Sequence, residues 1–256
     1  SGGSPKGDAS SLAPGAFSCS LIYQEPGRKA SVHHHAVEEL FFVHAGELTM
    51  TWQFGDETVD FVCRPGDAVL NPPNRPHGFR NDGSEGCVLQ IMVATAGPML
   101  PTYTDHPSDH ATSPLRPAGA ETRKASLGEI SRHVARTSDA RAQSRAVEGG
   151  TYTALPYVMQ PAFGGLVTPS HFCFALNTLT RGGRTPEYAR AAEEAFMVID
   201  GVLDLELGDG TATQRLGPRD LALVPPGLTR RLRNTDAATV RFASIVGDPA
   251  AAPLAW

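Results

Sequence analysis

The chain contains few cysteines and no long apolar run. Its 256 residues include only four cysteines, Cys19, Cys63, Cys87 and Cys173, and no two of them have C-x-x-C spacing. A disulfide-rich scaffold or a thiolate zinc site requires a denser or more regular pattern, so we interpret them as reduced thiols of a cytoplasmic protein. No apolar run approaches the roughly 20 residues of a membrane helix, and no signal peptide is visible, so we expect no membrane partner.

An excess of positive charge is also missing. The 22 Lys and Arg residues are outnumbered by 27 Asp and Glu residues, which gives a formal net charge of -5. Nucleic-acid-binding domains usually carry a basic surface, so we expect no nucleic-acid partner. The length permits one large domain or two of ordinary size. Residues 1–4 resemble a cloning scar, and we interpret residues 1–14 as a tail.

Residues of the types that bind metals are concentrated in two short segments. The first contains His33, His35 and Glu39, and the second contains His77. Because strand side chains alternate between two faces, His33 and His35 would share one face and His34 would lie on the other. Three neutral imidazoles and one carboxylate can hold a divalent transition metal and leave coordination positions open. We therefore predict a metal centre formed by His33, His35, Glu39 and His77.

The residues around these ligands resemble the paired motifs of the cupin superfamily, G-x5-H-x-H-x3-E-x6-G and G-x5-P-x-G-x2-H-x3-N. The match extends from Gly27 to Gly46 and from Gly66 to Asn81. Asn74 is the one departure, because it stands where the second motif has glycine. Asparagine adopts left-handed backbone more readily than most residues, so we expect the turn to be preserved. The resemblance implies an all-β jelly-roll barrel with the metal inside it, held by the four predicted ligands.

A second copy of this pattern follows in the C-terminal half. Residues 19–46 align without gaps on residues 174–201, and the register holds again from Gly55 over Gly208. Such a long-period duplication predicts two tandem cupin barrels, a bicupin.

The spacing of the two copies also predicts the domain boundaries. We expect the metal-binding barrel over residues 15–97, a linker over residues 98–150 and the second, degenerate barrel over residues 151–256. Within the linker, Ser126 and Glu129 have the spacing of a capping box, which predicts a short helix that opens there and extends through about Val134.

The ligand positions are not repeated in the second copy. Tyr188 replaces His33, Arg190 replaces His35, and Arg230 replaces His77, whereas Glu194 preserves the carboxylate. A guanidinium offers no lone pair to a metal, so we expect this barrel to be metal-free. Two interpretations remain open. The arginines either pair with Glu194 in a buried ion cluster, or they form a carboxylate-binding or regulatory pocket.

Within the cupins, the first copy looks most like the quercetin dioxygenase-like branch. That resemblance implies a metal-dependent dioxygenase that cleaves a small enolic or phenolic substrate, with Glu39 as metal ligand and general base. A redox-neutral isomerase, lyase, cyclase or hydrolase is the alternative. A ligand-binding cupin without turnover is a third possibility, because fold does not determine function.

The ligand set does not identify the metal or the substrate. Fe(II) is the first expectation, and Mn(II), Ni(II), Co(II), Cu(II) and Zn(II) are also compatible with it. The expected partners are a small-molecule substrate, dioxygen if the reaction is oxidative, and a second copy of the chain in a homodimer. Inward-facing strand residues would line the substrate pocket, and for these we predict Tyr23, Phe41, Val43, Gln90 and Met92.

Overall fold

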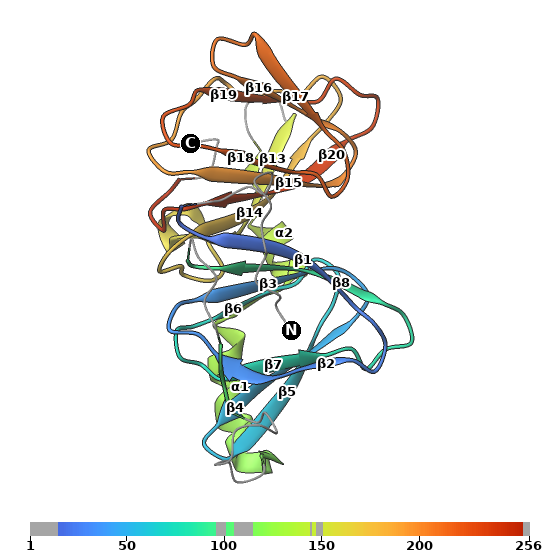
Figure 1. Cartoon of the computed structure of the whole chain (residues 1–256), viewed down its shortest axis with the longest axis vertical. Coiled ribbons are helices and arrows are strands. Elements are labelled where there is room, and N and C mark those ends of the chain that lie inside the picture. The colour runs from blue at the N-terminus through green and yellow to red at the C-terminus, as the bar shows by residue number, and fades with distance from the viewer. Residues whose placement is uncertain (1–14, 96–100, 105–114, 144, 147–150, 253–256) are drawn as a thin grey trace. The chain divides into compact units, whose positions relative to one another are not determined.

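The computed structural model describes residues 15–95, 101–104, 115–143, 145–146 and 151–252. The chain divides into two compact units at Thr137 and Ser138, and each unit is built from two β-sheets (Figure 1). This division lies inside the segment predicted as a linker, so the N-terminal part of that segment belongs to the first unit.

The first unit consists of a five-stranded and a six-stranded sheet, with the strand orders β1-β8-β3-β6-β11 and β10-β5-β4-β7-β2-β9. Except for β10, which runs parallel to β5, the paired strands are antiparallel. The strands are β1 (Ser18–Gln24), β2 (Lys29–His34), β3 (Glu39–Ala45), β4 (Leu48–Phe54), β5 (Glu57–Cys63), β6 (Ala68–Asn71), β7 (His77–Arg80), β8 (Cys87–Val93), β9 (Thr102–Tyr103), β10 (Arg116–Pro117) and β11 (Val134–Ala135).

The second unit consists of a six-stranded and a three-stranded sheet, with the strand orders β12-β13-β14-β20-β15-β18 and β17-β16-β19. The strands are β12 (Arg145–Ala146), β13 (Tyr152–Val158), β14 (Cys173–Leu179), β15 (Glu194–Asp200), β16 (Leu203–Leu207), β17 (Ala212–Leu216), β18 (Leu221–Val224), β19 (Arg230–Arg233) and β20 (Val240–Val246). Its helical elements are α2 (Thr137–Ala142), which begins at the boundary, and a 3-10 turn at Pro161–Phe163.

Alternating apolar residues produce the interior of the first unit. Leu48, Met50 and Trp52 of β4 are fully buried and contribute to one core cluster with residues of the opposite sheet, such as Phe41 and Leu89. The intervening side chains of β4 point to the other face, because strand side chains alternate with a period of two. The jelly-roll interior that the sequence predicted is therefore present.

Matching turns confirm the internal duplication. Gly46 and Gly201 close equivalent hairpins with φ values of 76° and 78°. Asn74 takes a left-handed backbone with φ of 60°, as predicted, and Gly227 occupies the equivalent turn with φ of 77°. Each turn donates one backbone hydrogen bond to the segment just before the strand that begins with the site carboxylate, from Asn74 to the carbonyl of His35 and from Gly227 to the carbonyl of Arg190.

The helix after the first barrel begins earlier than predicted. α1 extends over Ala120–Ser131, and Gly119 is its N-cap. Ser126, the predicted cap, lies buried in the middle of the helix, and Val134 belongs to β11 rather than to the helix. The capping-box prediction was wrong because Gly119 caps the helix without a side-chain hydrogen bond, so no capping motif marks its start. The helix stops before Val134 and Ala135, which pair with β6.

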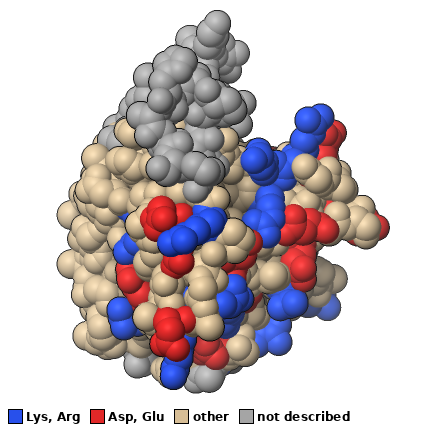
Figure 2. Space-filling model, turned by 90° about the horizontal axis from the view of Figure 1, so that it is seen from below, with Lys and Arg blue, Asp and Glu red and all other residues tan. Residues whose placement is uncertain are grey.

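No helix in the described part of the chain has both the length and the apolar character needed to cross a membrane. On the face drawn in Figure 2, the Lys and Arg side chains are interspersed with Asp and Glu side chains. Several charged side chains of the described residues form exposed ion pairs, such as Arg64 with Glu47. Pairs of this kind contribute little stability because water screens them.

The Gly46 turn provides a test of the packing between hairpins. A Cβ at Gly46 would lie 2.6 Å from the carbonyl oxygen of Gly86, whereas a Cβ at Gly55, which also has positive φ, would meet nothing within 4 Å. We predict that Gly55→Ala destabilises the first unit by about 1 kcal/mol through backbone strain. Gly46→Ala should destabilise the first unit by roughly 1–3 kcal/mol more than Gly55→Ala does, because its new Cβ would clash with backbone atoms. Urea unfolding of both variants measures the difference, and equal effects would contradict this packing.

The cysteines provide a second test. All four are free thiols. Burial raises the pKa of Cys63 to about 12 and the pKa of Cys87 to about 11, and both side chains are fully buried. Since the thiolate is the reactive form, we predict negligible labelling of these two thiols by Ellman's reagent at pH 8 in the native protein and complete labelling after unfolding. Rapid native labelling of either residue, identified by mass spectrometry, would refute the burial.

Candidate metal centre

Strand pairing brings the four predicted ligands together. His33 on β2 lies directly opposite His77 on β7. His35 follows the end of β2, and Glu39 is the first residue of β3. The Nε2 atoms of His33, His35 and His77 lie 3.9, 3.6 and 2.7 Å from Oε2 of Glu39. Three imidazoles therefore surround one carboxylate oxygen.

Backbone carbonyls orient two of the imidazoles. Nδ1 of His33 lies 2.8 Å from the carbonyl oxygen of Ser31, and Nδ1 of His77 lies 2.8 Å from that of Arg75. A carbonyl only accepts hydrogen bonds, so each Nδ1 carries the hydrogen and donates it. The Nε2 atom then keeps its lone pair and faces Glu39, so it is the nitrogen that could coordinate a metal. This is the second-layer arrangement that is typical of metal-binding histidines.

The environment favours the protonation states that a metal requires. The four side chains are nearly inaccessible, with residue exposures of 9% for His33, 8% for His35, 4% for Glu39 and 1% for His77. Burial lowers the pKa of His33 and of His35, which keeps these imidazoles neutral. Burial alone would raise the pKa of Glu39, but its 2.7 Å contact with His77 and the positive charge that the nearby imidazoles carry when protonated outweigh burial and lower that pKa. The carboxylate is therefore ionised at neutral pH.

This donor set fits a divalent transition metal. The candidate ligand atoms of His33, His35 and Glu39 all lie within 4.8 Å of one another. His77 lies outside that mutual group and joins it through its 2.7 Å contact with Glu39. Nδ1 of His35 has no hydrogen-bond partner among the described residues, so this imidazole is held less firmly than the other two. Nitrogen and oxygen donors without a thiolate suit Mn, Fe, Co, Ni or Zn.

A further layer of side chains fixes the strands that carry the ligands. Asn71 donates a 3.2 Å hydrogen bond to the backbone carbonyl of Glu39 and accepts a 2.8 Å hydrogen bond from the indole of Trp52. The guanidinium of Arg75 lies over the rings of Trp52 and Phe54, at 5.4 and 4.7 Å, and pairs with Glu129 of α1. Arg75 thus anchors the helix with its side chain and His77 with its carbonyl.

The second unit has different side chains at the positions equivalent to the four predicted ligands. Tyr188 and Arg230 form an isolated bridge that corresponds to the pairing of His33 with His77. Around Glu194, Arg230 Nε donates at 2.8 Å, Arg190 Nε at 3.1 Å and the Tyr188 hydroxyl at 3.1 Å. The pairing of both arginines with Glu194, one of the two interpretations of the sequence, is therefore confirmed.

Comparison with protein families agrees with this duplicated site. The cupin domain model matches residues 20–94 and 175–246, more than half of the chain. The chain belongs to the cupin domain family. Because the two matches coincide with the two units, this cupin is a bicupin, as the sequence predicted. No curated protein sequence was found to match the chain.

Solved structures with a similar fold include oxalate decarboxylases. The formate complex of the Lactobacillus farciminis enzyme has a TM-score of 0.70 and 13% identity, over 94% of this cupin and 79% of that chain. A Bacillus subtilis oxalate decarboxylase, described for its Mn(II) centres, has a TM-score of 0.68 and 15% identity, over 93% of this cupin and 70% of that chain. At these identities the likeness establishes the fold alone.

Two of the five predicted pocket residues face the barrel interior. Phe41 is buried with its ring 5.6 Å from that of His77, so it forms a wall of the metal centre. Val43 belongs to the same core cluster, two residues further along β3. Tyr103, which the sequence did not single out, lies on β9 opposite His33, with 5.7 Å between their rings. No motif marks Tyr103, because it reaches the site through a long-range strand pairing.

The predictions for Tyr23, Gln90 and Met92 were wrong. Leu89 and Ile91 belong to the interior cluster, so Gln90 and Met92 point to the opposite face of β8. Gln90 donates a hydrogen bond to the Cys19 thiol on that face. Tyr23 is 64% exposed. It pairs with Val88 of β8, and both side chains lie on the outer face of the sheet. In each case the prediction chose a residue on the outer face of its strand, whereas the adjacent residues face the interior.

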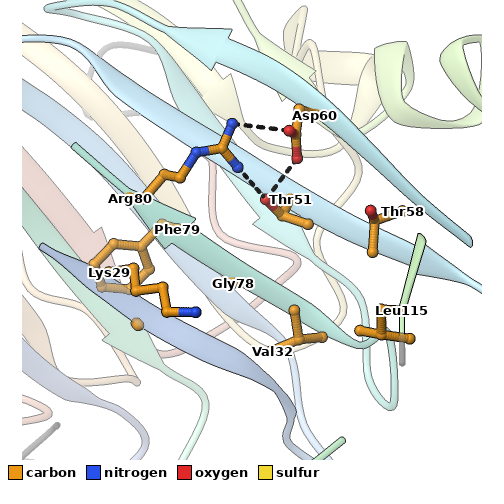
Figure 3. Close-up of a pocket in the computed structure, with 10 residues that line it drawn as sticks. Lys29, Val32, Thr51, Thr58, Asp60, Gly78, Phe79, Arg80 and Leu115 are labelled. Atoms are coloured by element: carbon orange, nitrogen blue, oxygen red, sulfur yellow. Dashed lines mark hydrogen bonds and ion pairs between the residues drawn. The ribbon is translucent and has the colours of Figure 1, made fainter. Parts of the chain in front are cut away.

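The pocket in Figure 3 is separate from the metal centre. It has a volume of about 230 Å³, and none of the four ligands lines it. Arg80 donates hydrogen bonds to Asp60 at 2.8 Å and to Thr51 at 3.1 Å, and Thr51 donates to Asp60 at 2.7 Å. Burial alone would raise the pKa of Asp60, but these hydrogen bonds and the Arg80 charge lower it. This pocket is a groove on the outer face of the six-stranded sheet, and its lining includes both polar and apolar residues.

The neighbouring histidines of β2 provide a matched test of the ligand set. We predict that His35→Ala lowers the bound metal by about tenfold or more, because it removes a coordinating nitrogen. His34→Ala should keep the metal, because His34 points to the other face of the strand. Inductively coupled plasma mass spectrometry of both purified variants measures the content, and circular dichroism controls for folding. Equal metal content in the two variants would disprove the assignment.

Proposed function

We propose that this bicupin is a metal-dependent enzyme whose first barrel catalyses a redox-neutral lyase reaction on a small carboxylic acid. The observation that carries the proposal is the convergence of three imidazole nitrogens on the ionised carboxylate of Glu39 in a buried site. A bound divalent cation would supply Lewis-acid stabilisation of negative charge on the substrate. The fold shared with oxalate decarboxylases favours decarboxylation among the lyase reactions.

Glu39 is the proton carrier in this proposal. Because its lowered pKa leaves the carboxylate ionised, it can accept the proton of a substrate carboxyl group. The bond between that carboxyl carbon and its neighbour then breaks, carbon dioxide leaves, and the electron pair remains on the neighbouring carbon. Glu39 returns the proton to that carbon, so no external oxidant or reductant is needed. Oxalate monoanion would give carbon dioxide and formate.

The surrounding residues hold the reacting groups and exclude water. His77 keeps Oε2 of Glu39 in place through the 2.7 Å contact, and the Arg75 carbonyl fixes the ring of His77. Phe41 provides an apolar wall against His77. A site with little water would strengthen the attraction between a bound divalent cation and an anionic substrate.

For the metal, we propose Mn(II) ahead of Fe(II). Mn(II) accepts mixed imidazole and carboxylate ligands, and the fold is shared with an enzyme that has Mn(II) centres. Fe(II) fits the same ligands, so metal analysis is part of the test.

Oxidative cleavage by a dioxygenase is the second candidate function. The motif around Glu39 and His77 resembles that of quercetin dioxygenase-like cupins, and the same ligand set serves both reaction classes. The two candidates differ in whether turnover consumes oxygen.

Turnover under controlled oxygen tests the proposal. We expect Mn(II)-loaded protein to release carbon dioxide and formate from oxalate without stoichiometric oxygen uptake in an oxygen electrode. Glu39→Gln should lower kcat by about 10²-fold or more, because the amide cannot carry the proton. His34→Ala should keep the activity.

A wider substrate panel gives the outcomes that oppose the proposal. Malonate, oxaloacetate, flavonols, catechols and β-diketones extend the screen beyond oxalate. Consumption of one oxygen molecule per turnover, with no reaction in its absence, would establish the dioxygenase instead. No turnover of any compound by the metal-loaded protein would favour a ligand-binding role.

A further inference from the structure

The charges around Glu194 in the second barrel do not balance. Arg190 and Arg230 carry two positive charges, because a guanidinium stays protonated in proteins, and Glu194 can carry one negative charge. Tyr188 completes the ring of four side chains and is neutral, because burial raises its pKa. These four residues therefore hold one unneutralised positive charge.

The hydrogen bonds show where that charge is least satisfied. Arg230 has an exposure of 0%, and it donates from Nε to Glu194 at 2.8 Å and from Nη1 to the carbonyl of Leu228 at 2.8 Å. Its Nη2 is buried and has no hydrogen-bond partner among the described residues. Both oxygens of Glu194 are already engaged by other donors, because Oε2 accepts from Arg230 Nε and Tyr188, and Oε1 accepts from Arg190.

We propose that the second barrel binds a small monocarboxylate anion at Arg230. A carboxylate supplies the acceptor oxygen that Nη2 lacks and the single negative charge that the ring of four side chains lacks. The guanidinium groups of Arg230 and Arg190 lie 5.1 and 5.6 Å from the ring of Tyr188, so both cations are held near one aromatic group. Arg190 and Tyr188 are only partly buried, which gives a ligand a route to the buried guanidinium.

The charge count also predicts the ligand class. A monoanion such as formate or acetate neutralises the excess, whereas a dicarboxylate would leave a net negative charge in a buried site. A cation is disfavoured by the two arginines. A single water molecule would satisfy Nη2 but would leave the charge, so it is the alternative that the experiment must exclude.

Calorimetric titration of the full chain with formate and acetate tests this site. The protein is treated with EDTA and carries His35→Ala, so that the first barrel does not bind the anions through a metal. At constant ionic strength set with chloride, we expect saturable binding of one anion per chain. Arg190→Gln should weaken this binding by about tenfold or more, because it removes the excess charge and leaves Arg230 in place.

A neighbouring arginine provides the matched control. Arg231 follows Arg230 on β19 but points outward and pairs with Glu206 and Glu187. Arg231→Gln should therefore bind formate and acetate like the parent protein, and thermal unfolding verifies that both variants fold. Absence of binding to the parent, which would mean a buried water only, or equal affinity in Arg190→Gln would overturn the proposal. These outcomes do not depend on activity of the first barrel.

Discussion

The site in each barrel depends on one cross-strand pairing, with a carboxylate at the start of a following strand. His33 lies opposite His77 in the first barrel, and Tyr188 lies opposite Arg230 in the second. Because strand pairing fixes both Cα positions, the side chains at these positions must meet inside the barrel. Their chemistry then determines what the barrel can hold, while the backbone frame stays the same.

The side chains at these equivalent positions carry opposite net charge in the two barrels. In the first, three imidazoles surround the ionised Glu39, and burial keeps two of them neutral by lowering their pKa values. That arrangement favours a cation. In the second, two guanidinium groups exceed the charge of Glu194, which favours an anion. Both barrels keep the supporting carbonyl two residues before the strand residue, from Arg75 to His77 and from Leu228 to Arg230. Duplication has thus preserved the support and changed the ligand chemistry.

Local patterns in the sequence predicted the ligands, but not the residues that surround them. Strand periodicity was sufficient to place His33 and His35 on one face, and the family motif supplied Glu39 and His77, which lie on other strands. The left-handed turn at Asn74 was also predictable, because it depends on the backbone of one residue. Tyr103 and the orientations of Gln90 and Tyr23 depend on which strands pair and in which register, and single-sequence patterns do not determine that pairing. The helix start was missed because Gly119 caps it without a side-chain hydrogen bond, so no local motif marks it.

The support of the metal centre extends into the segment that follows the first barrel. Arg75 links α1 to the site, because its side chain pairs with Glu129 and its carbonyl orients His77. β9 contributes Tyr103 beside His33, although it lies outside the matched cupin domain region. Since the four ligands alone suit several reaction classes, selectivity must come from the groups around them. Tyr103 and Phe41 are the described aromatic side chains in contact with imidazoles of the site, so the surroundings of the site come from the strand after the barrel as well as from the barrel itself.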